Sequence, residues 1–591
     1  MQNFTRLFDI PYYQLEKFPL EKSIGGKTNG SWHHYSTSEL ISQINKVSLG
    51  LLKLGLKPGD KIAMMSFSNR PEWNIMDMGM QQIGVINVPV YPTISPREYE
   101  YIFNDAEVKY SFVDGEVLVR KVRTAQPQVP SLIDIYSFNK VDQVKNWEEI
   151  FEEGDLSEVE SIKAGIKPED MATIIYTSGT TGNPKGVMLS HQNIISNIKS
   201  SIQYIPLEAG NQALSFLPLC HIFERMVSYG YQTIGVTITY AENVEKLGEN
   251  LLEVKPHFFT TVPRLLEKVY EKIYHKGHAL TGVKKKLFFW ALSLADHYEY
   301  DQQLGFFEKI QWAIADKLIF SKWRDALGGN VKGIITGSAA CPVKMARVFS
   351  AAGIPIREGY GLTETSPALT ISRFTKHGAL LGTVGPAVEG VSLKIAADGE
   401  ILAKGPNIMM GYYNKPEATA EVIDSDGWFH TGDIGEMVKG NHGYEFLKIT
   451  DRKKELLKTS GGKYVAPNPI ETMFKQDFLI EQIMVVGEGK KFVSALIVPA
   501  FPSLKEWAKE HHVEAASNKE LLLHPKVKEK FEQTVQNYNA YFSHIEQIKK
   551  FTLLTDEWTI DTGELTPTMK LKRRAIMQKF ANEIENMYAE S

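Results

Sequence analysis

The chain has only two cysteines, Cys220 and Cys341, among its 591 residues. Two are too few for a disulfide framework and suit a reducing compartment. No uninterrupted apolar run reaches the ~18 residues that a membrane-spanning helix needs, and the run at residues 287–295 ends at Asp296. Residues 1–6 lack the apolar core of a signal peptide. We therefore expect a cytoplasmic protein.

The chain also has little net charge, −4 at neutral pH, so nothing steers the whole molecule toward nucleic acid. We expect no nucleic-acid partner. With 43% hydrophobic and 23% charged residues, the composition is that of an ordinary soluble enzyme. Single hydrophobic cores rarely grow beyond roughly 250–300 residues. The length therefore predicts more than one domain.

The Walker phosphate loop is missing, but another glycine-rich stretch stands at residues 176–186 and reads Tyr-Thr-Ser-Gly-Thr-Thr-Gly-Asn-Pro-Lys-Gly. Pro184 and Gly186 flank its lysine, Lys185, whereas the Walker pattern requires Gly-Lys-Ser/Thr at the start of a helix. Glycines allow several backbone N–H groups to point one way and bind anions. Together with the hydroxyls and Lys185, they predict a polyphosphate site. Ser190 predicts the N-cap of a helix that reaches about residue 199.

Strand and helix patterns alternate along the first part of the chain. Apolar spacing predicts a helix over residues 38–55, and Pro71 suits the first turn of another. Strands are expected at 61–66, 85–90, 110–113, 133–136, 235–240, 255–264 and 331–340. This rhythm predicts mainly parallel sheets covered by helices. Residues 153–169 are acidic and polar, and we expect a surface connection there.

A second motif, at residues 354–365, carries chemistry. Tyr360 offers an aromatic face for a base, Thr363 a hydroxyl donor, and Glu364 a carboxylate suited to Mg2+. Upstream, the strand at 331–340 ends in small residues, which leave room for a flat ring at a carboxyl end where ligands gather in open α/β sheets.

These motifs resemble those of the AMP-forming adenylate superfamily, and most closely long-chain fatty acid–CoA ligases, over nearly the whole chain. The resemblance implies an α/β fold with a large N-terminal domain, residues 1–450, of mainly parallel sheets flanked by helices. A small α+β C-terminal lid domain, residues 451–591, would follow a hinge near Lys454, with helices expected over residues 503–510 and 519–543. A helical insertion at about 265–326 also resembles the long-chain enzymes.

The resemblance also implies roles for individual residues. Lys570, Thr177 and Glu364 would be catalytic, with Thr177 and Glu364 sharing Mg2+. Lys572 is the alternative to Lys570, because Thr-Met stands here where many relatives have Ser-Gly. His221, Gly461 and Gly462 would line the acyl and CoA path. The nucleotide would contact Thr177, Ser178, Gly179, Thr180, Thr181, Gly182, Lys185, Gly337, Ser338, Ala339, Glu358, Gly359, Tyr360, Gly361, Leu362, Thr363, Asp433, Arg452 and Lys570.

The helical insertion leaves two interpretations open. Phe306, Phe307, Ile310, Ile314 and Leu318 recur at three- or four-residue steps, which predicts an amphipathic helix. Its apolar face would pack on the main core, or it would contact a membrane surface or a lipid entry path.

The function implied is ATP-dependent activation of long-chain fatty acids, with release of pyrophosphate and transfer of the acyl group to CoA. ATP, Mg2+ and CoA would be required. The alternatives are a fatty acyl-AMP ligase that loads a carrier protein, a luciferase-like oxidase, a CoA ligase for medium-chain or other acids, and an adenylate-binding scaffold without activity. Peripheral contact with the inner face of a membrane and a homodimer are further expectations.

Overall fold

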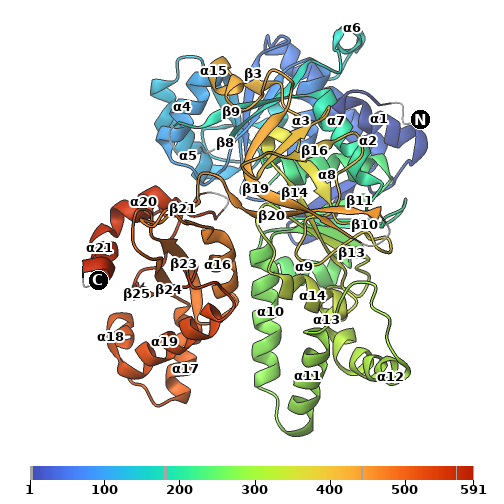
Figure 1. The fold of residues 1–591 in the computed structure, drawn as a ribbon. Helices are drawn as coiled ribbons and strands as arrows, with labels where there is room; N and C mark the ends of the chain where they lie inside the picture. The colour runs from blue at the N-terminus through green and yellow to red at the C-terminus, as the bar shows by residue number, and fades with distance from the viewer. Residues whose placement is uncertain (1–3, 178–182, 441–442, 567–568, 590–591) are drawn as a thin grey trace. The chain divides into compact units, whose positions relative to one another are not determined.

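The computed structural model describes residues 4–177, 183–440, 443–566 and 569–589. The chain divides into two compact units (Figure 1). The large unit comprises Met1–Lys394, Leu402–Thr431 and Met437–Leu447, and the small unit Ile395–Ile401, Gly432–Glu436 and Lys448–Ser591. Within the described ranges, no helix is both long enough and apolar enough to cross a bilayer.

The large unit holds two eight-stranded sheets whose central strands are parallel. The first has the order β15 (Ala368–Ile371), β14 (Ile356–Gly361), β13 (Gly333–Thr336), β12 (Phe258–Thr261), β10 (Gln212–Ser215), β11 (Thr237–Tyr240), β1 (Ile24–Thr28) and β2 (Ser31–Tyr35). The second has the order β18 (Gly411–Tyr412), β9 (Lys185–Ser190), β8 (Met171–Thr177), β4 (Ile86–Pro89), β3 (Lys61–Met65), β5 (Val108–Val113), β6 (Asp134–Ser137) and β7 (Lys145–Asn146).

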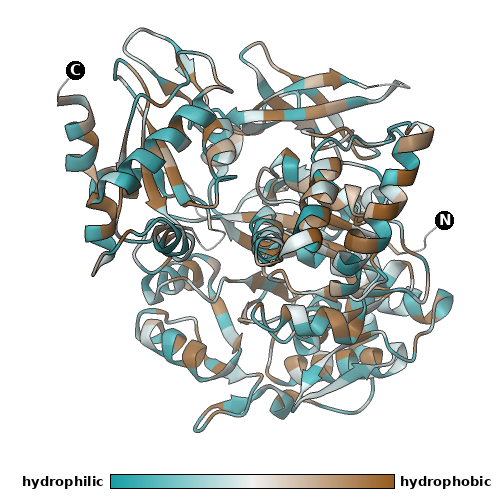
Figure 2. Ribbon diagram, turned by 90° about the horizontal axis from the view of Figure 1, so that it is seen from below, coloured by the Kyte–Doolittle hydropathy of each residue, from teal (hydrophilic) through white to brown (hydrophobic). Residues whose placement is uncertain are grey.

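Helices connect and cover these strands, as the alternating pattern predicts. The principal ones are α1 (Ile10–Lys17), α2 (Thr37–Lys53), α3 (Pro71–Gln82), α4 (Pro96–Ala106), α5 (Gly115–Ala125), α6 (Ser157–Gly165), α7 (His191–Ile202), α8 (Ile222–Thr233), α9 (Leu247–Val254), α14 (Val343–Ala351) and α15 (Pro416–Ala420). The N-cap prediction at Ser190 is confirmed: its hydroxyl accepts from Asn193 N at 3.1 Å. Pro71 is the first residue of α3. Figure 2 shows brown and teal alternating along the helices, as amphipathic helices require.

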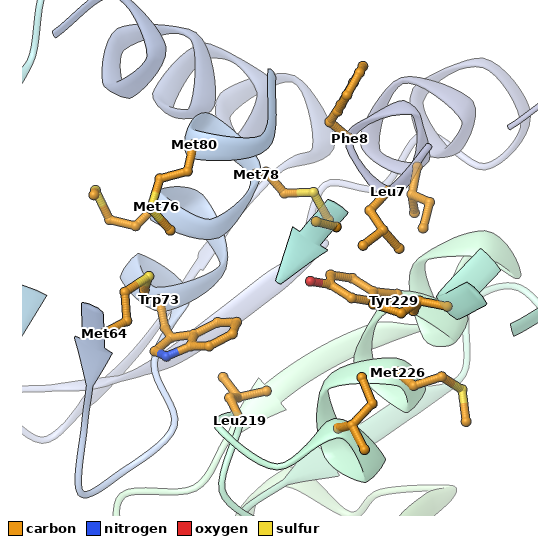
Figure 3. Packing of buried hydrophobic residues seen from close by; sticks show 14 of the residues in the cluster. Leu7, Phe8, Met64, Trp73, Met76, Met78, Met80, Leu219, Met226 and Tyr229 are labelled. Carbon is orange, nitrogen blue, oxygen red and sulfur yellow. The ribbon is translucent and has the colours of Figure 1, made fainter. Parts of the chain in front are cut away.

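The core of the large unit lies between α3, α8 and the two sheets. Figure 3 shows Met78 of α3 beside Tyr229 of α8 and Trp73 beside Leu219, with Met76 and Met80 on the side of α3 away from α8; all are at most 4% exposed. Met76, Met78 and Met80 fill irregular gaps, for which the unbranched thioether is well suited.

A fully buried ion pair crosses this core. Arg225 Nη2 lies 2.6 Å from Asp77 Oδ1, and both side chains have no exposed surface. The same guanidinium donates to Tyr229 Oη and to Thr173 Oγ1, each at 2.8 Å. Because a buried charge is tolerated only when paired and hydrogen-bonded, this network fixes α3, α8 and β8 against one another.

The predicted helical insertion consists of α10 (Pro263–His278), α11 (Gly282–Ala295), α12 (Phe306–Ala315), a π-helical turn (Asp316–Phe320) and α13 (Ser321–Ala326). In Figure 1, α10 and α11 lie side by side. The core-packing interpretation of α12 is wrong for its apolar stripe, because Phe306 and Phe307 are 75% and 79% exposed. Ile310, Ile314 and Leu318 are also exposed, and Ala315, Phe320 and Trp323 form the inner face instead.

The strands β16 (Ser392–Ile395), β17 (Glu400–Lys404), β19 (Phe429–Lys439) and β20 (Glu445–Arg452) form a further sheet. The small unit contains the sheet β23 (Ile480–Val486), β24 (Ser494–Pro499) and β25 (Lys550–Leu553). Alternate residues of β24 enter two clusters: Ile497 packs with Phe474 and Phe531, and Leu496 with Trp558 and Ile576. The helices are α16 (Pro467–Phe474), α17 (Phe501–Glu510), α18 (Asn518–Leu523), α19 (Pro525–Asn539), α20 (Arg573–Lys579) and α21 (Ala581–Ala589).

Three local expectations need correction. A single helix over residues 519–543 is wrong, because Pro525 starts α19 and separates it from α18. The connection at 153–169 contains the helix α6. Residues 185–190, for which the sequence analysis predicts no strand, form β9, so the glycine-rich stretch joins two antiparallel strands before Ser190 caps α7.

Candidate active site

The order in which the chain adds strands to the first sheet reverses at β10. The next strand, β11, lies on one side of β10, and β12, β13 and β14 lie on the other. In open α/β sheets a crevice forms outside the carboxyl ends of the strands at such a point, and ligands bind there. The segment after β10 ends at His221, which caps α8 by accepting from Phe223 N at 3.2 Å.

A pocket lies at this end of the sheet and encloses about 580 Å³, including space open to solvent. Its lining is largely apolar, as is common for sites that bind small molecules. Its wall is formed by Ser201, Ile202, Ile205, His221, Phe223, Met226, Val227, Ile335, Gly337, Ser338, Gly359, Tyr360, Gly361, Pro367, Ala368 and Ile371. Six of the residues singled out in the sequence therefore line one pocket.

Strand register brings these residues together. Thr336 of β13 pairs with Glu358 of β14, so Gly337 and Gly359 follow side by side. Burial raises the pKa of Glu358 to about 8. Gly361 approaches the next strand so closely that a Cβ there would lie 1.7 Å from Pro367 O. Among the other predicted contacts, Ala339 is exposed, and Leu362 and Thr363 are partly buried just beyond β14.

The predicted phosphate stretch begins and ends in the second sheet. Thr177 and Lys185 are cross-strand partners on β8 and β9, and Thr177 Oγ1 donates to Lys185 O at 3.4 Å. Ser178, Gly179, Thr180, Thr181 and Gly182 lie outside the described residues.

A tyrosine that the sequence analysis did not identify connects the two motifs. Tyr412 Oη donates to Glu364 Oε1 at 2.9 Å, and Lys185 Nζ lies 4.8 Å from the centre of its ring. Burial, and then the Glu364 carboxylate, raise the pKa of Tyr412, so its hydroxyl stays protonated and can donate.

Three asparagines, also missed, bind backbone carbonyls around the motif. Asn193 Nδ2 donates to Ile408 O at 2.8 Å, and Asn407 Nδ2 donates to Thr365 O at 2.8 Å. Asn197 accepts from Ala368 N at 3.0 Å and donates to Ala368 O at 2.7 Å. These bonds hold the turn at Thr363–Thr365 against α7. No local sequence pattern predicts them.

The donor set fits a magnesium ion that binds together with phosphates. Mg2+ usually takes one or two carboxylates and completes its shell with water and substrate phosphate oxygens. Glu364 supplies a carboxylate, and Thr177 a hydroxyl. The described part of the chain has no cluster of three or more His, Cys, Asp or Glu side chains, so an all-protein metal cage is absent there.

The small unit holds the remaining predicted residues. Arg452 Nε lies 3.8 Å from Asp433 Oδ1, so the two residues predicted to bind ribose are neighbours. Lys454 is exposed in a turn, and Gly461 and Gly462 are exposed in another. Gly462 has a φ of 73°, which favours glycine.

Lys570 is held by its backbone. Its N donates to Thr566 Oγ1 at 3.0 Å, and its carbonyl accepts from Thr566 N at 2.8 Å. Lys572 N donates to Glu564 O at 2.7 Å. Three residues beyond Lys570, Arg573 Nη2 lies 2.6 Å from Glu471 Oε1. The two candidate lysines thus sit on a backbone segment fixed from both sides.

Glu224, next in the chain to the pocket residue Phe223, makes the free energy of unfolding depend on pH. It is 1% exposed, accepts from Thr260 Oγ1, and its burial raises its pKa from 4.5 to about 7. The folded state therefore binds more protons than the unfolded state between these values, and stability falls as pH rises through them. We expect Glu224→Gln to abolish this loss, about 3 kcal/mol.

The measurement is urea unfolding of wild type and Glu224→Gln at pH 5 and pH 8. The contributions of other titrating groups to the free energy of unfolding cancel when the two proteins are compared. Equal pH dependence of both would show that Glu224 is ionised throughout this range.

Comparison with known proteins gives the same picture over the whole chain. Residues 14–413 match the family described as AMP-binding enzyme, and residues 454–591 match the AMP-binding enzyme C-terminal domain. The chain is 35% identical over 573 residues to the long-chain-fatty-acid–CoA ligase FadD15 of Mycobacterium bovis, covering 95% of this chain and 93% of that one. It is 32% identical to long-chain-fatty-acid–CoA ligase 1 of Homo sapiens, covering 94% and 82%.

Among solved structures, the adenylation domain of a carboxylate reductase from Mycobacterium chelonae superposes with a TM-score of 0.74 at 21% identity, covering 99% of this chain and 91% of that one. A fatty acyl CoA synthetase of Mycobacterium tuberculosis gives 0.60 at 19% identity, covering 99% and 100%. These likenesses confirm the predicted α/β fold.

Proposed function

This chain belongs to the AMP-binding enzyme family, in which its relatives are long-chain-fatty-acid–CoA ligases, and we propose that it activates long-chain fatty acids with ATP and transfers them to CoA. The carboxylate attacks the α-phosphorus of ATP, giving an acyl adenylate and pyrophosphate. The CoA thiolate then attacks the acyl carbon, and AMP leaves.

One observation carries this proposal: the motif at residues 354–365 contributes both to the apolar pocket and to a polar cluster formed by Glu364, Tyr412 and Lys185. Gly359, Tyr360 and Gly361 line the pocket, and Glu364, three residues on, is linked through Tyr412 to Lys185. The adenine ring and the acyl chain both require an apolar environment, and the triphosphate requires a polar one. The reaction joins the acid and the nucleotide where these two environments meet.

The roles of single residues are part of the proposal. Tyr360 stacks on adenine beside Gly337, Ser338 and Ala339, with Glu358, Gly359, Gly361, Leu362 and Thr363 around the nucleotide. The stretch from Thr177 to Lys185, Ser178, Gly179, Thr180, Thr181 and Gly182 included, holds phosphates. Glu364 and Thr177 would hold Mg2+, which neutralises charge on the phosphates when bound. Asp433 and Arg452 bind ribose.

Negative charge builds on the phosphates during adenylation, and preorganised groups that face developing charge commonly make the largest contribution to catalysis. Lys185 and Lys570 supply it in the proposed mechanism, and His221 lies on the acyl path. The proposed domain boundary is at residues 450/451, with the hinge at Lys454. Rotation of the small domain about this hinge would withdraw Lys570 and bring in Gly461 and Gly462 for the attack of the CoA thiol.

The experiment is CoA consumption by the purified protein with ATP and Mg2+ across acids from two to twenty carbons. Long-chain acids should give the highest kcat/KM, with one AMP per CoA consumed. Activity restricted to medium-chain acids would correct the substrate class. AMP formation without CoA consumption would favour transfer to a carrier protein.

We further propose peripheral contact of α12 with the inner face of a membrane. Its exposed apolar residues, Phe306 and Phe307 above all, lie on a segment with three exposed lysines, Lys309, Lys317 and Lys322. An apolar face with basic residues beside it suits an anionic lipid surface.

For this contact we expect Phe307→Glu to weaken binding to phosphatidylglycerol vesicles about tenfold, since a buried phenylalanine contributes roughly 1.5–3 kcal/mol. The matched control is Leu523→Glu, an exposed apolar residue of α18 (61%). Sedimentation with vesicles measures both. Equal loss in the two variants, or no binding by wild type, would exclude contact through α12.

A further inference from the structure

We propose that Tyr412 is a positioning residue that sets Glu364 and Lys185 in one arrangement for the metal-bound triphosphate. This inference rests on the proposed function and adds a residue that neither motif contains. Tyr412 comes from a strand 48 positions after Glu364 in the chain, and it lies between the two motifs in the folded large unit.

The hydroxyl and the ring face of Tyr412 contact two different residues. Its hydroxyl donates to Glu364 Oε1 at 2.9 Å, and its ring face lies 4.8 Å from Lys185 Nζ. It is only 7% exposed, so both interactions act with little competition from water. A ring face attracts an ammonium group without bringing a negative charge to it, so this contact orients Lys185 without competing with a phosphate for its charge.

The backbone of Tyr412 is itself fixed. It pairs with Val187 of β9, and its N donates to Thr419 Oγ1 at 2.9 Å. Met409 N donates to Glu364 O at 2.9 Å, so the segment that leads into β18 also holds the main chain of Glu364. The phenol therefore cannot move independently of either motif.

This arrangement is that of a hydrogen-bonded metal ligand. Carboxylates that bind metals are commonly oriented by a second side chain, and loss of that partner typically lowers metal affinity roughly 10–100-fold. Glu364 is the described residue that best fits such a ligand here, and Tyr412 is its orienting donor.

The test uses Tyr412→Phe, which removes the hydroxyl and keeps the ring under Lys185. We expect the affinity for Mn2+ of the complex with α,β-methylene-ATP, measured by electron paramagnetic resonance, to fall about tenfold. Binding of the same nucleotide without metal should stay within twofold of wild type, because the ring remains. Tyr412→Leu should weaken the metal-free binding as well.

The matched control is Tyr240→Phe, which removes a buried hydroxyl that donates to Asn74 Oδ1 at 2.6 Å. It should lose similar thermal stability and bind Mn2+ as wild type does. Wild-type Mn2+ affinity in Tyr412→Phe would overturn this inference while leaving the proposed function intact. If wild type bound no metal–nucleotide complex and formed no acyl adenylate, the proposed function would fail with it.

Discussion

Lys570→Ala lowers the rate of acyl-adenylate formation about 10²–10³-fold, the loss typical when one preorganised group facing developing charge is removed. Formation of acyl-CoA from pre-made acyl adenylate stays within about threefold of wild type, because no charge builds on the β- and γ-phosphates in that step. The two half-reactions are followed separately, by fatty-acid-dependent exchange of pyrophosphate into ATP and by acyl-CoA formation from synthetic acyl-AMP.

Lys572→Ala is the matched control for this result. The backbone bonds of Lys570 to Thr566 do not involve the lysine side chain, so the alanine variant keeps them. If Lys572→Ala lost adenylation and Lys570→Ala kept it, the lysine would be Lys572. Equal loss of both half-reactions in Lys570→Ala would contradict the assigned role.

Gly361→Ala has the second large expected effect. The added Cβ would stand 1.7 Å from Pro367 O and 2.6 Å from Pro367 C, so β14 and β15 must separate. Such overpacking costs about 3 kcal/mol of stability. Displacing Tyr360, the preceding residue, should lower adenylation about 10²-fold, since misplacement by about 1 Å has that effect.

Gly359→Ala is the control for the steric part of this argument. Its Cβ would meet Thr370 O at 3.6 Å, an ordinary contact, so we expect wild-type stability in urea unfolding. Gly361→Ala with wild-type stability would show that Gly361 and Pro367 are not packed as closely as described.

The sequence predicted features that depend on neighbours in the chain. Ser190 predicts the start of α7 because its hydroxyl accepts a hydrogen bond from the N–H three residues later. Pro71 predicts the start of α3 because its fixed φ suits a first helical turn. The residues 337–338 and 359–361 could be expected together, because parallel strands end at one edge.

The remaining features depend on contacts that the sequence does not display. Tyr412 meets Glu364 and Lys185 because β18, two residues long, pairs with β9, and so short a strand has no periodic signal. The apolar stripe of α12 shows the converse: its period predicts a helix, but period alone cannot say that Phe306 and Phe307 face away from the core. The roles of the site residues remain predictions.

The central claim, that a fatty carboxylate attacks the α-phosphorus of ATP, is tested most directly by isotope transfer. The enzyme is incubated with ATP, Mg2+, CoA and a long-chain acid labelled with ¹⁸O in both carboxyl oxygens. The ¹⁸O content of AMP and pyrophosphate is then measured by mass spectrometry. We predict one ¹⁸O atom in each AMP and none in pyrophosphate. Unlabelled AMP, or label in the pyrophosphate, would contradict the account.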